Sequence, residues 1–280
     1  MADFATIGAA LSYGAAWLDG LPTARRDAEL LLIHVVGRDR AYLLTHPEAR
    51  LAPVQVALYE AWLARRVRHE PIQYIVGEQE FFGLKFRVTR DVLIPRPETE
   101  HLVAAALARV ERETPLRIAD IGTGSGAIAV ALAHALPQAQ VTAVDISLAA
   151  LAVARSNAEI NGVSGRIRFC ESDLLDAVRG ESFDMIVSNP PYVAEDEVLD
   201  PQVRDYEPAT ALFAGAAGLD IYRRLIPQAQ AALKSGGWLL LEIGHGQRNA
   251  LASLLSSWNN VSFVDDLQGI PRVACARRAE

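Results

Sequence analysis

Two short segments carry residue types that could do chemistry, and each directly follows an apolar run. The first reads Asp-Ile-Gly-Thr-Gly-Ser-Gly over residues 120–126 and precedes an apolar, helix-forming stretch. Glycines at such a strand-to-helix turn let the backbone approach a ligand closely, with the helix N-terminus behind it. This glycine loop, Gly122–Gly126, therefore predicts a nucleotide-type ligand. Gly122, Gly124 and Ala127 also fit a dinucleotide fingerprint, so the loop alone leaves a nicotinamide enzyme open.

The second segment is Ser-Asn-Pro-Pro-Tyr over residues 188–192, which ends the fourth predicted strand of a parallel sheet. Doubly wound folds bind ligands at that edge. Two consecutive prolines hold the backbone rigid, so the Asn189 side-chain oxygen and the Pro190 carbonyl would be two acceptors for one NH₂ group. Hydrogen bonds from both N–H groups to these acceptors favour a pyramidal nitrogen whose lone pair faces an electrophile. Tyr192 would pack against the planar group. The alternative is an ordinary turn without chemistry.

Acidic residues follow the second and third predicted strands. Asp145 closes the run Val-Thr-Ala-Val-Asp, where a carboxylate could accept hydrogen bonds from both ribose hydroxyls of an adenosine ligand. It could instead cap the following helix, although Ser147 would serve equally well as the N-cap. Asp173 could accept a hydrogen bond from an adenine amino group or simply be solvated.

Strands and helices alternate from Leu116 onward, as in folds with a parallel sheet. Short apolar runs predict five buried strands, at 116–121, 140–145, 166–170, 183–188 and 238–243. Helices are expected at 127–136, 148–160 and 219–233. Two more strands, at 261–264 and 272–276, have a connection too short for a crossover helix and should pair antiparallel. The fold class is therefore α/β, with a doubly wound, mostly parallel seven-stranded Rossmann-like sheet and an antiparallel C-terminal strand pair.

The sequence before this sheet divides into two parts. Apolar residues recur at three- and four-residue steps through the first 70 positions, and glycines and prolines separate about four helical segments. Between 71 and 97 the period changes to two, which predicts a β-hairpin with Gly83 at a turn or bulge and one apolar face made of Phe82, Leu84, Phe86 and Val88. A helix over 100–111 should follow. We therefore expect a small helical bundle (1–70), a hairpin connector (71–97) and a catalytic domain (98–280).

Composition disfavours several classes of protein. The 280 residues carry 27 Lys and Arg against 34 Asp and Glu, a formal net charge of −7, and the dispersed positive charge disfavours a nonspecific nucleic-acid binder. The two cysteines lack the spacing of a zinc site and fit a reducing compartment. No apolar run is long enough to span a membrane, and the N-terminus lacks a basic signal-peptide start. We expect a cytoplasmic protein that binds no metal.

Taken together, the glycine loop, the acid ending the second strand and Asn-Pro-Pro-Tyr resemble the class I S-adenosylmethionine-dependent methyltransferases that act on planar NH₂ nitrogens. Further stretches narrow the resemblance to the release-factor glutamine methyltransferases, the HemK/PrmC family. These are Pro-Ile-Gln-Tyr-Ile-Val-Gly from position 71, Glu-Phe-Phe-Gly-Leu from 80, Leu-Ile-Pro-Arg-Pro-Glu-Thr-Glu from 93 and Val-Arg-Asp-Tyr-Glu-Pro from 203. The resemblance covers nearly the whole chain.

The resemblance implies methyl transfer from S-adenosylmethionine to the side-chain amide of the glutamine in the Gly-Gly-Gln motif of class-I peptide chain release factors. This reaction modulates translation termination, leaves S-adenosylhomocysteine and implies no metal, no stable nucleic-acid partner and no membrane. By position, the implied cofactor-binding residues are Gly122, Thr123, Gly124, Ser125, Gly126, Asp145, Asp173, Leu174 and Asn189. The implied glutamine-binding residues are Asn189, Pro190, Pro191 and Tyr192, of which Asn189, Pro190 and Tyr192 are catalytic. The helical bundle would recognise the protein substrate.

The chain departs from the family pattern at two positions. Leu174 stands where some relatives have an aromatic residue, so it could line an adenine pocket but not stack on the base. Ala217 stands where an acid often precedes a glycine.

Three other functions remain open on the residues alone. A DNA or RNA adenine amino-methyltransferase would use Asn-Pro-Pro-Tyr in the same way, to hold an exocyclic amine. Such an enzyme would need a basic target-recognition region. A nicotinamide dehydrogenase leaves Asn-Pro-Pro-Tyr unexplained, and a non-catalytic adaptor would bind the cofactor without transferring its methyl group.

Overall fold

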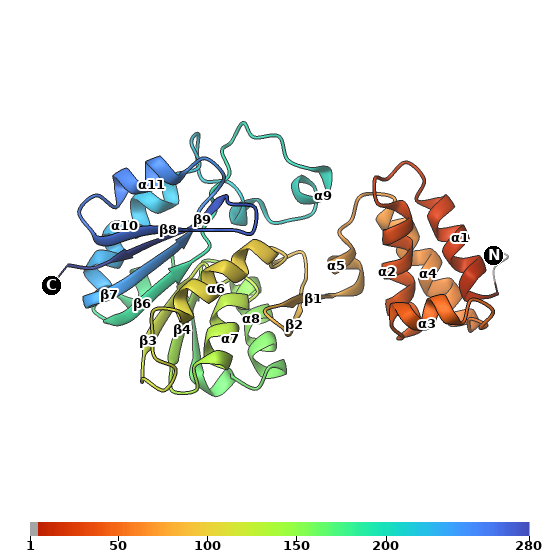
Figure 1. Cartoon of the computed structure of the whole chain (residues 1–280), viewed down its shortest axis with the longest axis horizontal. Coiled ribbons are helices and arrows are strands. Elements are labelled where there is room, and N and C mark those ends of the chain that lie inside the picture. The colour runs from red at the N-terminus through yellow and green to blue at the C-terminus, as the bar shows by residue number, and fades with distance from the viewer. Residues whose placement is uncertain (1–4, 280) are drawn as a thin grey trace. The chain divides into compact units, whose positions relative to one another are not determined.

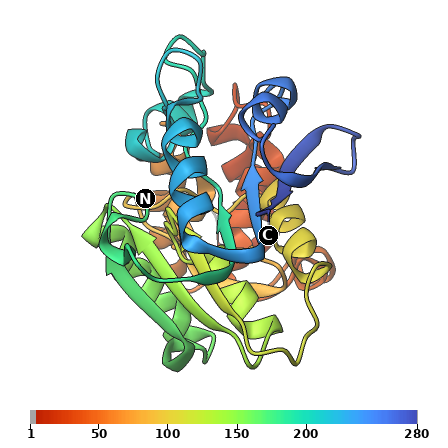
Figure 2. The same cartoon turned by 90° about the vertical axis from the view of Figure 1, so that its left-hand side faces the viewer.

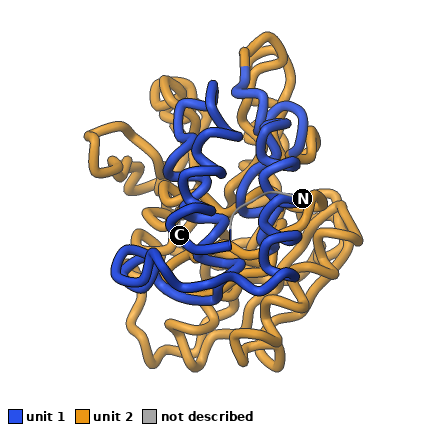
Figure 3. The backbone as a smooth tube through the Cα atoms, turned by 90° about the vertical axis from the view of Figure 1, so that its right-hand side faces the viewer, with its two compact units in different colours: residues 1–77, 199–206 blue, residues 78–198, 207–280 orange. Residues whose placement is uncertain are grey.

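A computed structural model describes residues 5–279 of the protein, which form two compact units (Figure 3). The first unit runs to Gly77 and includes the distant segment Leu199–Tyr206, while the second comprises Glu78–Val198 and the chain from Glu207 onward. The first unit thus extends past Glu70, where the bundle was expected to end, because a further short helix follows that residue.

The first unit is built from helices whose apolar faces meet in one core. The helices are α1 (Ile7–Trp17), α2 (Ala24–Val36), α3 (Arg40–Thr45), α4 (Pro53–Arg66), α5 (Ile72–Val76) and, in the distant segment, α9 (Pro201–Arg204). Helix α2 packs against both α1 and α4 (Figure 1), and Leu31, Leu32, Tyr59 and Leu63 are fully buried between them. The bounds follow local signals, since Pro53 opens α4 and Gly37, with φ of 68°, ends α2.

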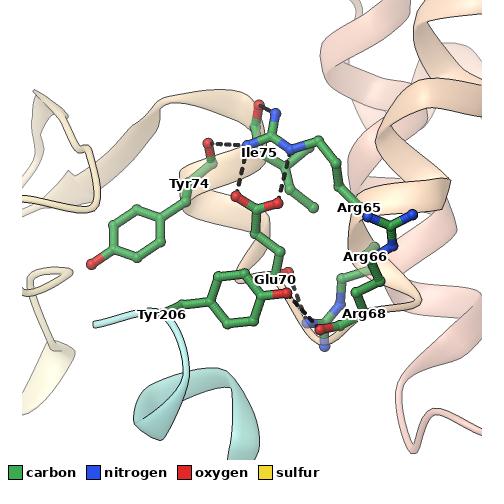
Figure 4. A network of polar contacts seen from close by, with 7 residues as sticks. All are labelled: Arg65, Arg66, Arg68, Glu70, Tyr74, Ile75 and Tyr206. Carbon is green, nitrogen blue, oxygen red and sulfur yellow. Dashed lines mark hydrogen bonds and ion pairs between the residues drawn. The ribbon is translucent and has the colours of Figure 1, made fainter. Parts of the chain in front are cut away.

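A network of polar contacts lies at the C-terminal end of α4 (Figure 4). The Arg65 guanidinium donates to both carboxylate oxygens of Glu70, at 2.8 and 2.9 Å, and to the carbonyls of Tyr74 and Ile75. The Tyr206 hydroxyl donates to the Arg68 carbonyl at 2.7 Å. These bonds hold α5 and the segment Leu199–Tyr206 within the first unit.

The second unit begins with the predicted hairpin, β1 (Glu78–Phe81) and β2 (Leu84–Arg87), which pair antiparallel. The apolar face predicted for it is wrong in one respect. Phe82 and Gly83 form a two-residue turn with φ of 51° and 72°, the geometry that matches strand twist. Because the chain reverses there, Phe81 rather than Phe82 joins Phe86 in the core, and their rings meet edge to face.

A seven-stranded sheet in the order β5-β4-β3-β6-β7-β9-β8 forms the centre of this unit. Its strands are β3 (Arg117–Ile121), β4 (Gln140–Asp145), β5 (Ile167–Glu171), β6 (Phe183–Ser188), β7 (Leu233–Glu242), β8 (Asn259–Asp265) and β9 (Pro271–Arg277). The strands β3 to β7 are parallel, whereas β9 pairs antiparallel with both β7 and β8. The predicted fold class is thus confirmed.

Helices cover both faces of this sheet (Figures 1 and 2). One core cluster contains buried residues of α6 (Glu100–Leu107), α7 (Ala127–Ala135) and α8 (Leu148–Ile160), and the other contains those of α10 (Asp220–Ala232) and α11 (Arg248–Leu254). Short 3-10 turns complete the unit at η1 (Pro97–Thr99), η2 (Ser164–Arg166), η3 (Asp176–Val178) and η4 (Ala209–Ala211). No helix within residues 5–279 has the length and apolar character needed to cross a membrane.

Replacing Arg65 with Met should lower the local free energy of unfolding of α5 by about 2–3 kcal/mol, because it removes two charge-assisted donors from the buried Glu70 carboxylate. Hydrogen exchange of the α5 amides in the full chain measures this loss. Arg40→Met is the matched control, since the Arg40 side chain is 70% exposed in its ion pair with Glu29. That control should change protection by less than about 0.5 kcal/mol. Equal effects of the two variants would contradict the inference that Arg65 holds α5 in place.

Candidate active site

The strand order reverses between β3 and β6, which are adjacent and parallel although β4 and β5 lie between them in the chain. Ile121 is in register with Ser188, and the Ser188 hydroxyl donates to the Ile121 carbonyl at 2.6 Å. The glycine loop follows Ile121 and Asn-Pro-Pro-Tyr follows Ser188, so both begin at the same point of the sheet edge. Open α/β sheets bind ligands at such a switch point.

A cavity of 390 Å³ opens at this edge, within the size range of small-molecule sites. All the predicted site residues except Gly126 and Tyr192 line it, namely Gly122, Thr123, Gly124, Ser125, Asp145, Asp173, Leu174, Asn189, Pro190 and Pro191. Residues that the sequence did not single out also line it, among them Pro95, Arg96, Thr99, Phe213 and Arg224.

The glycine loop has the backbone conformation that only glycine adopts easily. Gly122, Gly124 and Gly126 have φ of 69°, 54° and 80°. A Cβ atom on Gly126 would also come within 3.0 Å of the Ala154 Cβ on α8. Gly126 therefore has a structural role at this turn, allowing the loop to lie close to α8, while Gly122 and Gly124 face the cavity.

Asp120, the residue before Ile121 at the end of β3, holds the glycine loop in place. Its buried carboxylate accepts from the Thr123 hydroxyl at 2.6 Å and from the Ala129 amide at 3.1 Å, which joins the loop to the first turn of α7. Burial raises the pKa of Asp120 to about 7, against the smaller lowering from these two donors.

Asp145 already contacts the glycine loop. Its Oδ2 accepts from the Gly124 amide at 2.8 Å and its Oδ1 from the Ser147 amide at 2.9 Å. Ser147, not Asp145, is the N-cap of α8, since its hydroxyl accepts from the Ala150 amide. Each carboxylate oxygen has a second lone pair, so Asp145 keeps acceptor capacity for a ligand in the cavity.

Asp173 and Leu174 lie at the same cavity. Asp173 forms an ion pair with Arg224 on α10 at 2.6 Å, and both side chains are nearly half exposed. Leu174 adopts φ of 51°, a left-handed conformation that is uncommon for a residue other than glycine. The wall contributed by this segment thus combines one ion pair with one apolar side chain.

In Asn-Pro-Pro-Tyr, two acceptor oxygens receive no hydrogen bond from residues 5–279. Asn189 Nδ2 donates to the Thr99 hydroxyl at 3.1 Å. Among the described residues no hydrogen bond reaches Asn189 Oδ1 or the Pro190 carbonyl. The Tyr192 hydroxyl instead faces Glu242 at the end of β7, with Oε1 at 3.4 Å. Asn189 and Pro190 therefore present oxygens to a donor, and Tyr192 is held behind them.

Residues distant in sequence hold this segment in place. Gln247, at the start of α11, donates through Nε2 to the carbonyls of Tyr192 and Gly218, at 3.0 and 3.2 Å. Arg96 at the cavity pairs at 2.6 Å with Glu207, whose side chain is 1% exposed. Neither interaction was predicted from the sequence. Arg96 and Glu207 belong to stretches that carry the family resemblance, but nothing local pairs them across 111 positions.

Asn157 on α8 connects the hairpin to the glycine loop. It is fully buried, and its Oδ1 accepts from the Arg87 amide at 2.7 Å. Its Nδ2 donates to the carbonyls of Arg87 and Ser125, at 3.0 and 2.8 Å. One side chain thus fixes the end of β2 and the backbone of the cavity wall together.

No cluster of three or more His, Cys, Asp or Glu side chains arranged to hold a metal ion occurs in the part of the chain that the structure describes.

Replacing Asn157 with Ala should destabilise the second unit by about 2–4 kcal/mol, because the Arg87 amide, the Arg87 carbonyl and the buried Ser125 carbonyl lose their partner at once. Thermal unfolding followed by circular dichroism measures the loss. Asn161→Ala is the matched control at the C-cap of the same helix, where Nδ2 donates to the carbonyls of Lys85 and Asn157, both at 2.9 Å. A decrease in melting temperature no larger than that of the control would contradict the role assigned to Asn157.

Family models match both parts of the chain. The PrmC N-terminal domain model matches residues 9–77, and the Methyltransferase small domain model matches residues 101–205. Among solved structures, the Thermus thermophilus 16S rRNA N2 G1207 methyltransferase in complex with AdoMet and guanosine has a TM-score of 0.55 at 21% identity, over 72% of this chain and 49% of that one. A methyltransferase from Pyrococcus furiosus has a TM-score of 0.53 at 18% identity, over 71% and 91%. These structures share the fold.

Relatives with similar sequences extend over almost the whole chain. A release factor glutamine methyltransferase of Koribacter versatilis is 48% identical, over 92% of this chain and 92% of the relative. One from Cereibacter sphaeroides is 47% identical with the same coverage. Because the match spans both the helical unit and the sheet that forms the cavity, the chain belongs to the release factor glutamine methyltransferase family.

Proposed function

We propose that the protein transfers a methyl group from S-adenosylmethionine to the side-chain amide nitrogen of the glutamine in the Gly-Gly-Gln motif of class-I peptide chain release factors. The observation that carries the proposal is the pair of acceptor oxygens that receive no hydrogen bond from the described residues, Asn189 Oδ1 and the Pro190 carbonyl, beside the glycine loop in one cavity. The names of the relatives indicate which group receives the methyl group, a glutamine of a release factor.

The cavity residues fit this cofactor. Gly122 and Gly124 present backbone without side chains, Asp145 has acceptor capacity left for ribose hydroxyls, and Leu174 provides an apolar wall for adenine. Asp173 accepts from Arg224 and has a second oxygen for an adenine amino group. When bound, S-adenosylmethionine supplies an electrophilic methyl group on a sulfonium.

The residues of Asn-Pro-Pro-Tyr would activate the amide by orientation. An amide nitrogen is a poor nucleophile because its lone pair is delocalised into the carbonyl. Asn189 Oδ1 and the Pro190 carbonyl can each accept a hydrogen bond from one N–H of this amide. These two hydrogen bonds favour a pyramidal nitrogen and stabilise the positive charge that develops on it during attack. Pro191 keeps the backbone rigid, and Tyr192, held by Gln247 and Glu242, fixes the end of the segment.

The proposed reaction also bears on the location of the protein in the cell and on its partners. Release factors act in translation, so we propose a cytoplasmic location. The net charge of −7 disfavours stable nucleic-acid binding, and no metal enters the proposed chemistry.

Mass spectrometry of the Gly-Gly-Gln peptide, after incubating a full-length release factor with the protein and S-adenosylmethionine, tests the activity. We expect one added methyl group on the glutamine side chain. Parallel reactions with adenine-containing DNA and RNA should give no methylated base. Methylated adenine with unmodified glutamine would overturn the proposal in favour of a nucleic-acid enzyme.

Two variants should separate transfer from cofactor binding. Asn189→Ala should lower kcat by about a hundredfold or more, because it removes one of the two acceptors that orient the amide. Asp145→Ala should instead raise the Kd for S-adenosylmethionine by about tenfold or more, since each bond to a charged acceptor contributes about 1.5–3 kcal/mol. At saturating cofactor, Asp145→Ala should keep most of its kcat. Calorimetry and steady-state kinetics measure both, and an Asn189→Ala variant with wild-type turnover would contradict the assignment.

We also propose that the first unit recognises the release factor. A glutamine side chain alone buries too little area for useful affinity, so a second contact surface is needed. Every residue lining the cavity belongs to the second unit, which leaves the first without a catalytic task. On α4, Val54 and Leu58 lie four residues apart and are 73% and 40% exposed. They form an apolar strip suited to a protein partner.

The double variant Val54→Ser/Leu58→Ser should raise KM for the full-length factor several-fold and leave kinetics on a short Gly-Gly-Gln peptide unchanged. The fold should be retained, because both side chains already face solvent. Leu267→Ser is the control, since Leu267 is 96% exposed on the second unit. If the double variant affected factor and peptide equally, or behaved like the control, α4 would not be the recognition surface.

A further inference from the structure

Arg96 lies at the same end of the cavity as Asn-Pro-Pro-Tyr. It precedes η1, where the Thr99 amide donates to the Arg96 carbonyl at 3.1 Å. The Thr99 hydroxyl accepts from Asn189 Nδ2, also at 3.1 Å, and both Arg96 and Thr99 line the cavity. The charge of Arg96 also opposes the rise that burial causes in the pKa of Tyr192. Arg96 is therefore a neighbour of the segment that is proposed to hold the substrate amide.

The two arginines that line this cavity among the described residues lie at different parts of it. Arg224 forms an ion pair with Asp173, whose other oxygen is proposed to accept from the adenine amino group. Arg96 is close to Asn189 instead, through Thr99. The cation near the proposed glutamine site is thus Arg96.

Glu207 fixes the Arg96 guanidinium. Its Oε1 accepts from Arg96 Nη2 at 2.6 Å, and the Glu207 side chain is 1% exposed. The Arg96 side chain, in contrast, is 32% exposed. Its guanidinium therefore extends from a buried carboxylate toward solvent, at the mouth of the cavity. The residues after Glu207 that line the cavity are Pro208, Thr210, Ala211 and Phe213.

The far end of this wall is held without Arg96. The Val193 amide donates to the Leu212 carbonyl, and the Ala214 amide donates to the Val193 carbonyl, both at 2.9 Å. An arginine that served only to tether the near end of the wall would need no donors beyond the one that reaches Glu207.

The Arg96 guanidinium has such further donors. Within residues 5–279 its only side-chain hydrogen bond is the one to Glu207. A guanidinium carries several other N–H groups in one plane, and it can bind two acceptors at once. Because Arg96 lines the cavity and is partly exposed, these N–H groups are available to a ligand there.

The position of Arg96 at the mouth indicates which acceptor it would meet. When a glutamine side chain enters the cavity and its amide meets Asn189 and Pro190, the main chain that carries it stays at the mouth. Main-chain carbonyls that lose water there need new donors. A donor on the side-chain carbonyl would instead oppose the reaction, because it draws the nitrogen lone pair further into the amide.

The charge of the pair favours the same acceptor. Arg96 and Glu207 are neutral together, so they suit a neutral carbonyl better than a phosphate or a carboxylate. They also add no net positive charge beside a sulfonium. Adenine, the acceptor of the competing reaction, has no carbonyl group.

We propose that Arg96 binds a main-chain carbonyl of the Gly-Gly-Gln loop and that Glu207 holds its guanidinium in place for this contact. The inference rests on the proposed function and deepens it. Asn189 and Pro190 then recognise the side-chain amide, whereas Arg96 recognises the peptide that carries it.

Steady-state kinetics of Arg96→Met in the full chain test the contact. KM should rise by about tenfold or more for both a short Gly-Gly-Gln peptide and the full-length factor, because a bond from a charged donor is lost. The value of kcat should change much less, since the contact is the same in the bound substrate and in the transition state. Calorimetry should give an unchanged Kd for S-adenosylmethionine. Arg223→Met is the matched control, because Arg223 forms an ion pair with Asp220 in which both side chains are more than half exposed.

Thioamide peptides separate a substrate contact from a merely structural role. Sulfur accepts hydrogen bonds more weakly than oxygen, so each main-chain carbonyl of the Gly-Gly-Gln peptide is replaced in turn. One replacement should raise KM several-fold for the wild type and have no further effect on Arg96→Met, because both changes remove the same bond. Glu207→Gln keeps Arg96 with an amide oxygen as its partner. It should therefore raise KM by a smaller factor than Arg96→Met does and keep the thioamide effect.

A further variant protects the test against loss of the fold. Arg96→Lys keeps a cation beside Glu207, and it should still raise KM several-fold because an ammonium lacks the planar fork that reaches two acceptors. Wild-type KM in both Arg96 variants, or equal thioamide effects in the wild type and Arg96→Met at all three carbonyls, would overturn the inference. A higher Kd for S-adenosylmethionine with unchanged KM would also overturn it, in favour of the cofactor carboxylate. Failure of the wild type to methylate glutamine in peptide and factor would overturn the proposed function instead.

Discussion

The register between β3 and β6 is the constraint on which the site depends. These strands are neighbours in the sheet although two other strands separate them in the chain, and Ile121 lies opposite Ser188. A shift of one residue would reverse the face of every β6 side chain and move Asn189 away from the glycine loop. The Ser188 hydroxyl, bonded to the Ile121 carbonyl, locks the two strands at the residue where both motifs begin.

Three buried acids surround this edge, and each supports a different part of the cavity. Asp120 holds the glycine loop through Thr123, Glu207 holds Arg96, and Glu242 approaches Tyr192. Burial raises the pKa of all three, and each keeps one oxygen without a hydrogen-bond partner among the described residues. The enzyme therefore accepts unfavourable burial of charge where it needs fixed orientation, as expected for a preorganised site.

Local pattern was sufficient for most of the fold. The alternation of short apolar runs with helical stretches predicted the parallel sheet, and the short connection between β8 and β9 predicted their antiparallel pairing. Local pattern predicted the hairpin and a turn or bulge at Gly83, but it was wrong about Phe82, which lies in the two-residue turn and not on the apolar face. Hydropathy alone does not say which aromatic residue the turn contains, and the pairing of Phe81 with Leu84 in β1 and β2 shows that it is Phe82.

The sequence by itself determined which residues could do chemistry, since glycines before a helix and Asn-Pro-Pro-Tyr after a strand carry their meaning in residue type and spacing. Tertiary structure alone decided what holds those residues in place. Asn157 meets Arg87 across 70 positions, Asn189 meets Thr99 across 90, and Arg96 meets Glu207 across 111. Periodicity reports only neighbours within a few residues along the chain, whereas these side chains meet because separate elements end at one edge of the sheet.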